Sequence, residues 1–177
     1  MAALRSAAST YTLVQKDGVT PAALRRYIER IYFVSPCNRF AAGATTCTAG
    51  ADGGKPVPTL KRLEIAAVAG ITGFVTTPLV DGIQNLQLDY GIDATGTGVP
   101  ATPFVTAPAL ADWPNVMTVH VSLLARNTEA SSFVDSTLSA RTFNMGVSGS
   151  VGPFSDKFKR HVYTGTVQVI NLSSRRE

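Results

Sequence analysis

The apolar residues of this chain alternate with polar ones in several short runs, and such alternation predicts β-strands rather than helices. The clearest example lies within residues 78–93, PLVDGIQNLQLDYGID. Leu86, Leu88 and Tyr90 fall on one side of the run, and the intervening Gln and Asp fall on the other. Because successive side chains of a strand point to opposite faces, we expect a half-buried strand whose Leu86, Leu88 and Tyr90 face the core.

The same pattern predicts further strands at residues 25–34, 59–65, 74–76, 115–126, 139–145 and 159–172. The 115–126 run, NVMTVHVSLLAR, is a natural antiparallel partner for the strand within 78–93. Residues 25–34 carry strong β-formers on both sides, which predicts a central strand, paired with residues 59–65. The glycine-rich residues 146–152 are expected to be flexible.

Composition limits the fold class and the number of domains. The chain has 177 residues, is 45% hydrophobic and 16% charged, and contains 15 Gly and 10 Pro. These values suit one domain with its own core, and the lack of long Ala-Leu-Glu-Lys runs favours a mostly β fold with many turns. We expect a poorly defined segment at residues 1–24, a β-rich domain at residues 25–172 and a frayed tail at residues 173–177.

Charge is distributed unevenly along the sequence. The net charge is +4, yet residues 63–125 contain no Lys or Arg and hold Glu64, Asp81, Asp89, Asp93 and Asp112. A charge-segregated surface suits electrostatic docking to another protein. Nucleic acid is not an expected partner, because the basic clusters are short and alternate with apolar strand residues.

No apolar run approaches the ~20 residues that span a membrane. The first residues, MAALRSAASTYTL, also lack the cationic start and the apolar core of a signal peptide. By themselves, these observations predict a soluble chain without an export route.

Candidate catalytic residues are sparse, so no enzyme is expected. His120 and His161 accompany many serines, but a Gly-x-Ser-x-Gly elbow is absent. The glycine-rich residues 91–98 and 146–152 are not followed by Gly-Lys-Ser/Thr, which argues against nucleotide binding.

A calcium loop is the one metal site that the sequence suggests. Asp89, Asp93, Thr95 and Thr97 place oxygen donors at alternating positions between glycines. Two of the four are uncharged and no nearby Glu adds a bidentate ligand, so an ordinary polar loop is favoured and calcium stays the alternative.

An ordered set of segments resembles one family. RRYIERIYFVSPCN, PTLKRLEI, PLVDGIQNLQLDYGID, ADWPNVMTVHVSLLARN and RHVYTGTVQVINL follow one another from about residue 25 onward. Together they resemble the C-terminal part of PilW-family proteins, which are minor pilins of the bacterial type IV pilus. The resemblance implies a pilin-like α+β fold with an antiparallel sheet, and an acidic run at the position of the calcium-loop candidate. It also implies a leader and a long apolar N-terminal helix that this sequence lacks, so we expect a fragment, a truncated reading frame or a divergent gene.

The resemblance further implies a structural role. The expected function is that of a minor pilin that takes part in pilus assembly and priming near the pilus tip. Its expected partners are other minor pilins, the major pilin and a tip adhesin, in the inner membrane, the periplasm and the pilus surface, with the membrane reached only through the N-terminal helix. The alternatives are a J-type pseudopilin of type II secretion and a small non-catalytic binding module.

The only two cysteines, Cys37 and Cys47, flank the first part of a loop at residues 38–58. Their spacing suits either a disulfide in an oxidising compartment or two free thiols in a reducing one. The extracytoplasmic setting that the resemblance implies favours the disulfide, which would stabilise the fold by roughly 2–3 kcal/mol in the chain-entropy model.

Overall fold

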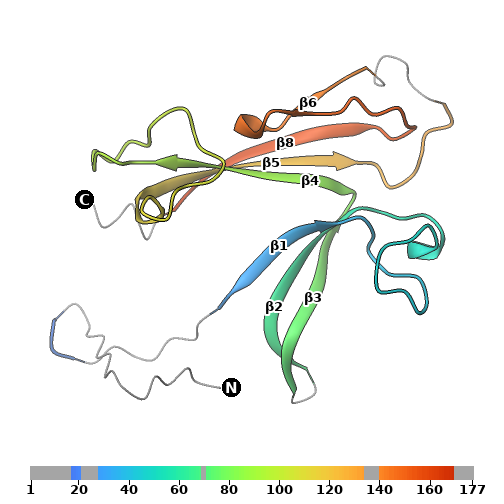
Figure 1. Cartoon of the computed structure of the whole chain (residues 1–177), viewed down its shortest axis with the longest axis horizontal. Coiled ribbons are helices and arrows are strands. Elements are labelled where there is room, and N and C mark those ends of the chain that lie inside the picture. The colour runs from blue at the N-terminus through green and yellow to red at the C-terminus, as the bar shows by residue number, and fades with distance from the viewer. Residues whose placement is uncertain (1–16, 21–27, 69–70, 134–139, 170–177) are drawn as a thin grey trace. The chain divides into compact units, whose positions relative to one another are not determined.

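The computed structural model describes residues 17–20, 28–68, 71–133 and 140–169 of the chain (Figure 1). The described part is mostly β, with antiparallel pairing, and it contains no α-helix. This confirms the expected fold class. The strands are β1 (Arg30–Ser35), β2 (Thr59–Val68), β3 (Ile71–Asp81), β4 (Ile83–Ile92), β5 (Val116–Arg126), β6 (Phe143–Asn144), β7 (Ser150–Val151) and β8 (Arg160–Gln168). Short 3-10 turns lie at η1 (Ala51–Gly53), η2 (Trp113–Asn115) and η3 (Gly146–Ser148).

The chain divides into two compact units. The first comprises Met1–Ile31 and Arg62–Thr77, and the second comprises Tyr32–Lys61 and Pro78–Glu177. Strands β1, β2 and β3 form a three-stranded sheet in that order and each has residues in both units. Within the first unit, Glu64 accepts hydrogen bonds from Arg30 Nε at 3.1 Å and from Arg62 Nη2 at 2.8 Å.

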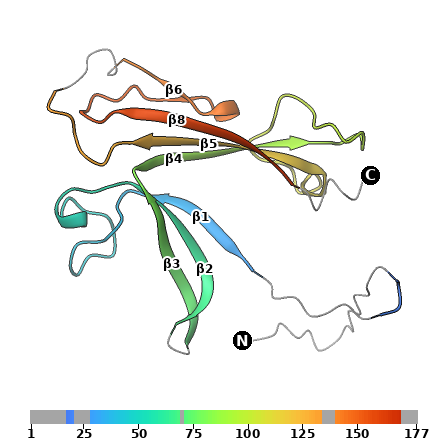
Figure 2. The same cartoon turned by 180° about the vertical axis from the view of Figure 1, so that it is seen from behind.

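The second unit is built on a three-stranded sheet of order β4-β5-β8 (Figures 1 and 2). Strand β5 is central, and both pairings are antiparallel. Leu88 lies opposite Val121, and Leu123 lies opposite Tyr163. The predicted pairing of the strand within residues 78–93 with the strand at residues 115–126 is therefore confirmed.

Cross-strand neighbours share a face, so the register defines the two faces of this sheet. Face A carries the side chains of Asn85, Gln87, Asp89, His120, Ser122, Leu124, Val162, Thr164 and Thr166. Face B carries those of Leu86, Leu88, Tyr90, Val119, Val121, Leu123, Tyr163 and Val167.

The hydrophobic core of the second unit lies on face A, beneath the hairpin formed by β6 and β7. Leu124 and Met145 are fully buried and pack with Phe143, which is 6% exposed. Val162 and Phe154 pack against this cluster from the side. The hairpin thus lies over face A and carries most of its apolar cover.

The expectation that Leu86, Leu88 and Tyr90 face the core is wrong in one respect. They do share one face, but all three are only partly buried there, whereas Asp89 on the opposite face is 2% exposed. The physical reason is the hairpin, which covers the more polar face. Hydrophobic alternation showed which side chains of β4 share a face, but it did not show which face the rest of the chain covers.

Other expectations need smaller corrections. β1 is an edge strand of its sheet rather than a central one, and most of its residues are exposed. Residues 146–152 form η3 and β7 instead of a flexible linker. β2 and β3 are longer than expected, β6 is shorter than the expected strand at residues 139–145, and residues 25–27 and 170–172 lie outside the described part.

Gly82 joins β3 to β4 in a turn that only glycine fits. Its φ is 85°, and a Cβ at this position would meet the Arg126 carbonyl oxygen at 2.5 Å. Its amide donates to the Pro58 carbonyl at 2.7 Å, and its carbonyl accepts from the Arg126 amide at 2.8 Å. The turn is therefore bonded to the end of β5 and to the segment before β2.

The two faces predict different costs for truncating a leucine. Leu124→Ala should lower the free energy of unfolding by about 2–5 kcal/mol, because it empties space beneath the hairpin. Leu88→Ala should lower it by about 1–2 kcal/mol, because Leu88 already contacts solvent. Urea unfolding of both variants measures the difference, and equal losses would contradict the assignment of the faces.

Candidate interaction surface

A surface groove lies in the second unit beside the start of β4. Its volume is about 660 Å³, and apolar side chains form much of its wall. The residues that line it are Tyr32, Phe33, Val34, Pro36, Pro56, Pro58, Gln84, Asn85, Leu86 and Arg126. Tyr32 is 49% exposed, so an aromatic side chain is offered to solvent here.

The lining of this groove combines rigid apolar rings with two side-chain amides. Its lining includes no Ser, Thr, Cys, His, Asp, Glu or Lys side chain. Proline and aromatic rings offer rigid apolar surface, and Gln84 and Asn85 offer amide groups beside them. The groove can therefore hold a chain segment, but its lining offers no activated nucleophile with an adjacent base.

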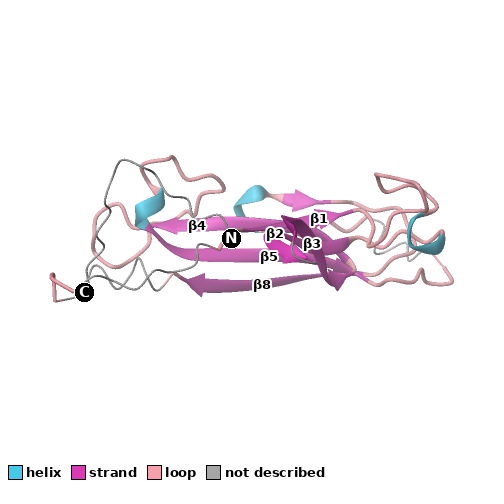
Figure 3. Cartoon of the chain, turned by 90° about the horizontal axis from the view of Figure 1, so that it is seen from below, coloured by secondary structure: helices cyan, strands magenta, loops and turns pink. Residues whose placement is uncertain are grey.

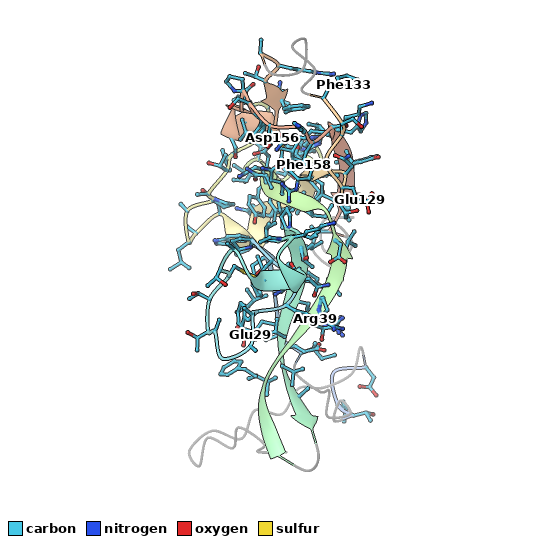
Figure 4. The ribbon with its side chains drawn as sticks, turned by 90° about the vertical axis from the view of Figure 1, so that its right-hand side faces the viewer. Glu29, Arg39, Glu129, Phe133, Asp156 and Phe158 are labelled. Carbon is cyan, nitrogen blue, oxygen red and sulfur yellow. A yellow bond between two sulfur atoms is a disulfide. The ribbon has the colours of Figure 1, made fainter. Side chains whose placement is uncertain are left out.

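Arg126, in the groove lining, belongs to a cluster of two arginines and two aromatic rings. The Arg126 guanidinium lies 3.9 Å from the Phe158 ring centroid, and Arg160 lies 3.9 Å from the Phe154 ring centroid. Arg160 donates to both Asp156 oxygens, and its side chain is 3% exposed. Figure 4 labels Asp156 and Phe158, which lie on the segment that leads into β8.

Opposite charges hold Arg160 and Asp156 together in this cluster, whereas Arg126 and Arg160 repel each other. The hydrogen bond from Arg160 lowers the pKa of the Asp156 carboxyl, against the effect of burial. Burial lowers the pKa of Arg126, and the neighbouring Arg160 lowers it further. Arg126 Nη2 also donates to the Pro56 carbonyl at 2.9 Å, which ties the groove wall to the end of β5.

The loop at residues 38–58, called the cystine loop below, continues from the groove wall at Pro36 and returns to it at Pro56. Cys37 and Cys47 form a disulfide with a Cα–Cα distance of 5.7 Å, as expected from their setting. Asp52 closes the rest of the loop, because its carboxylate accepts from the amides of Asn38, Arg39 and Val57 at 2.9, 2.6 and 2.9 Å. Asp52 adopts a φ of 52°, and Asp is one of the few residue types that tolerate this conformation.

Burial raises the pKa of Asp52, but the three backbone N–H donors, with Lys61, outweigh it and hold the pKa below the ordinary 3.8. The folded loop therefore favours the charged Asp52 carboxylate over the protonated acid. The Asp-Gly-Gly run at residues 52–54 is the sequence signal for this role, because such runs are typical of turns in which an Asp side chain accepts from nearby amides.

Face B of the β4-β5-β8 sheet is a second candidate surface. Its central apolar side chains are partly exposed, and Tyr163 and Val167 at its β8 side are 59% and 58% exposed. The rings of Trp113 and Tyr90 meet edge-on with their centroids 5.1 Å apart, and Trp113 is 45% exposed. A continuous apolar sheet face that remains partly in water is typical of a protein interface.

Asp89 and Asp93 do not form a common site. The Asp89 carboxylate lies under η3, where its Oδ2 accepts from the Val147 amide at 3.0 Å. A Cβ on Gly146 would meet this oxygen at 2.0 Å, so the turn needs glycine. Asp89 Oδ1 and Ser122 Oγ are buried with no partner in the described structure.

Asp93, Thr95 and Thr97 do come together, in the loop after β4. Asp93 is fully buried, and its Oδ1 accepts from the amides of Thr95, Gly96 and Thr97. Its Oδ2 accepts from the Gly98 amide at 2.8 Å. These N–H donors occupy the oxygens that a cation would need, an arrangement typical of a polar Asx-type loop.

Within the described residues, no group of three or more His, Cys, Asp or Glu side chains is placed to hold a metal ion. Calcium binding at Asp89, Asp93, Thr95 and Thr97 stays the untested alternative to the ordinary polar loop that the sequence favours.

The two histidines lie on opposite faces of the sheet. His120 is on face A, where its Nδ1 is 3.1 Å from the Thr166 hydroxyl. His161 is on β8 beside Tyr163, with ring centroids 4.7 Å apart. Their side chains therefore cannot meet in one site.

The charge segregation of the sequence is not carried fully to the surface. Asp89 and Asp93 are buried, and Glu64 is paired with two arginines. The acidic stretch thus presents less charge to a partner than its composition suggests. The groove and the apolar face, which the charge pattern did not indicate, are the larger features.

The lowered pKa of Asp52 predicts an acid-dependent loss of stability. A carboxyl with a lowered folded pKa contributes its stability fully above its unfolded pKa and loses it as pH falls through the folded pKa. We expect the difference in unfolding free energy between the wild type and Asp52→Asn to shrink from about pH 5 downward. Urea unfolding at a series of pH values measures this difference, and a difference that grows on acidification would contradict the prediction.

The four amides that donate to Asp93 predict that its carboxylate stabilises the fold without a bound metal ion. Asp93→Ala should lower the melting temperature by several degrees, since it removes the buried acceptor of four loop amides. Millimolar calcium should leave the melting temperatures of both proteins unchanged. A rise in the wild type alone on adding calcium would instead establish the calcium site.

In the described residues, no helix has the length and apolar character needed to cross a membrane. No curated protein and no solved structure matches the chain. The family model described as Type IV Pilus-assembly protein W matches residues 45–171, which include residues 45–58 of the cystine loop and every strand from β2 to β8. The chain therefore belongs to the PilW family of type IV pilus-assembly proteins.

Proposed function

We propose that this chain is the structural head of a minor pilin, which takes part in priming and assembling the pilus near its tip. Family membership gives the broader role in type IV pilus assembly and indicates the cell envelope as its location. The proposal adds that the chain acts through protein–protein interfaces and performs no catalysis. Its proposed partners are other minor pilins, the major pilin and a tip adhesin.

The observation that carries this proposal is the state of face B. Eight apolar or aromatic side chains from β4, β5 and β8 lie together on it, and none of them is fully buried. A soluble monomer gains little from such a face, because apolar surface left in water contributes no burial energy. A subunit that must join an assembly gains from it directly.

The groove beside β4 supports the same role. Its rings and prolines can receive a segment of a neighbouring subunit, and it lacks the groups that chemistry would require. The histidines, on opposite faces, give no support to a hydrolase.

A complementation experiment tests the role of face B in the bacterium that encodes the protein. Deletion of the gene should reduce the number of surface pili seen by electron microscopy, and the wild-type gene should restore them. Val121→Asp should fail to restore them, because it places a carboxylate at the centre of the apolar face. Val99→Asp is the matched control, since Val99 is 68% exposed in the loop after β4.

Circular dichroism of the purified variants separates loss of an interface from loss of folding. If Val121→Asp does not fold, Leu88→Gln provides a milder polar change on the same face. Normal piliation of the deletion strain would contradict a role in assembly, and full restoration by a folded face B variant would contradict this surface as the interface.

A further inference from the structure

Strand β8 forms one edge of the β4-β5-β8 sheet, and Figure 3 shows it as the outermost strand. It pairs with β5 along all nine of its residues without a shift in register. Its other side has no strand beside it in the described structure. An edge of this kind offers unpaired main-chain donors and acceptors to another strand.

The hydrogen bonds at both ends of β8 show which residues offer these groups. The Val169 amide donates to the Met117 carbonyl at 2.7 Å, and the Lys159 carbonyl accepts from the Asn127 amide at 3.1 Å. Odd-numbered residues therefore direct their main chain towards β5. Because this direction alternates along a strand, Thr164 and Thr166 direct theirs outward.

The edge lacks the devices that usually prevent strand pairing. Residues 161–168, HVYTGTVQ, contain no Lys, Asp, Glu or Pro, and β8 has no bulge. Natural edge strands are commonly protected by a charge, a proline or a bulge. β8 instead carries β-branched and aromatic residues, which favour pairing.

A second copy of the same strand fits this edge in one antiparallel register. If the two-fold axis passes at Gly165, Thr164 of one copy forms the hydrogen-bonded pair with Thr166 of the other. In the same register, Tyr163 lies opposite Val167 of the second copy. These two side chains are 59% and 58% exposed, and aromatic–β-branched pairs are favourable across strands.

Two further features favour a second copy over a foreign strand. The absence of Lys, Arg, Asp and Glu from residues 161–168 leaves no like charges to oppose across the two-fold axis, and it offers no counter-charge to a charged foreign strand. Gly165 has nothing within 4 Å of the position of a Cβ, so the residue at the axis brings no side chain into the contact. The pairing is also isologous, the usual form of a closed dimer.

We propose that two copies of this chain associate through antiparallel pairing of their β8 edges, centred on Gly165, into one continuous sheet. The face B surfaces of the two copies then join across the axis. A contact of this size is smaller than a typical stable interface, so the dimer should be weak and concentration-dependent. This inference goes beyond the proposed minor-pilin role and does not rest on it.

A proline and a valine at the same position test the main-chain contact. Thr164→Pro removes an outward N–H while leaving the ladder with β5 intact, since proline is tolerated where the N–H of an edge strand faces solvent. Thr164→Val keeps the N–H and replaces only the hydroxyl group with a methyl group. Sedimentation equilibrium from about 10 µM to about 1 mM should detect dimers of the wild type and of Thr164→Val, but not of Thr164→Pro.

A charge exchange tests the register independently of the proline. Val167→Glu should weaken dimerisation about tenfold or more, because it opposes a carboxylate to Tyr163 of the second copy. The double variant Tyr163→Lys/Val167→Glu should regain most of the lost affinity, because the introduced lysine then faces the introduced glutamate of the second copy across the axis. Both positions are exposed in the single chain, so the fold should tolerate these changes.

The possible outcomes decide the proposal. A wild type that stays monomeric over the whole range overturns it, and so does a folded Thr164→Pro variant that dimerises like the wild type. If Thr164→Pro fails to fold, the charge exchange decides: recovery in the double variant supports the pairing, and no recovery overturns it. Loss of piliation in the deletion strain is unaffected by these results, so the two proposals can fail separately.

Discussion

The packing of the β6–β7 hairpin on one face of the β4-β5-β8 sheet is the contact on which the second unit depends. A sheet of three strands is stable only when an apolar face is covered. Met145 and Phe143 provide that cover by packing on Leu124, and Val162 joins them from β8. The hairpin precedes β8 in the chain, so the same segment that closes the core also delivers the last strand to the sheet.

This cover is one-sided, and the asymmetry shapes the rest of the surface. Face A receives the hairpin, the η3 turn over Asp89 and the His120–Thr166 contact. Face B keeps its apolar side chains partly in water. Within the described residues, a hairpin therefore covers only one face of this sheet.

The local structure could be predicted from the sequence better than the packing. Alternation located β4 and β5 and suggested their pairing, because the two-residue period of a strand can be read from neighbouring positions in the sequence. It could not show that Asp89 is buried, since the cover comes from Val147 and Gly146, which lie far along the chain. It also placed β1 in the centre of a sheet, because apolar residues on both sides of a strand do not reveal whether neighbours exist on both edges.

In the candidate site, too, local features could be predicted from the sequence and long-range packing could not. The disulfide followed from two cysteines in one loop and their expected compartment, whereas the groove did not follow, because only the folded chain brings its walls together.

The cystine loop is anchored at two independent points, by the disulfide and by the Asp52 carboxylate. The residues between Cys37 and Cys47 that are exposed and free of a positive φ, such as Ala42, Thr45 and Thr46, carry neither anchor. Substitutions there should leave the fold unchanged, because the ends of the loop stay fixed whatever lies at its tip. The tip of this loop is thus a place where sequence can diverge among related chains, and where a short peptide tag can be inserted, while the scaffold beneath it stays the same.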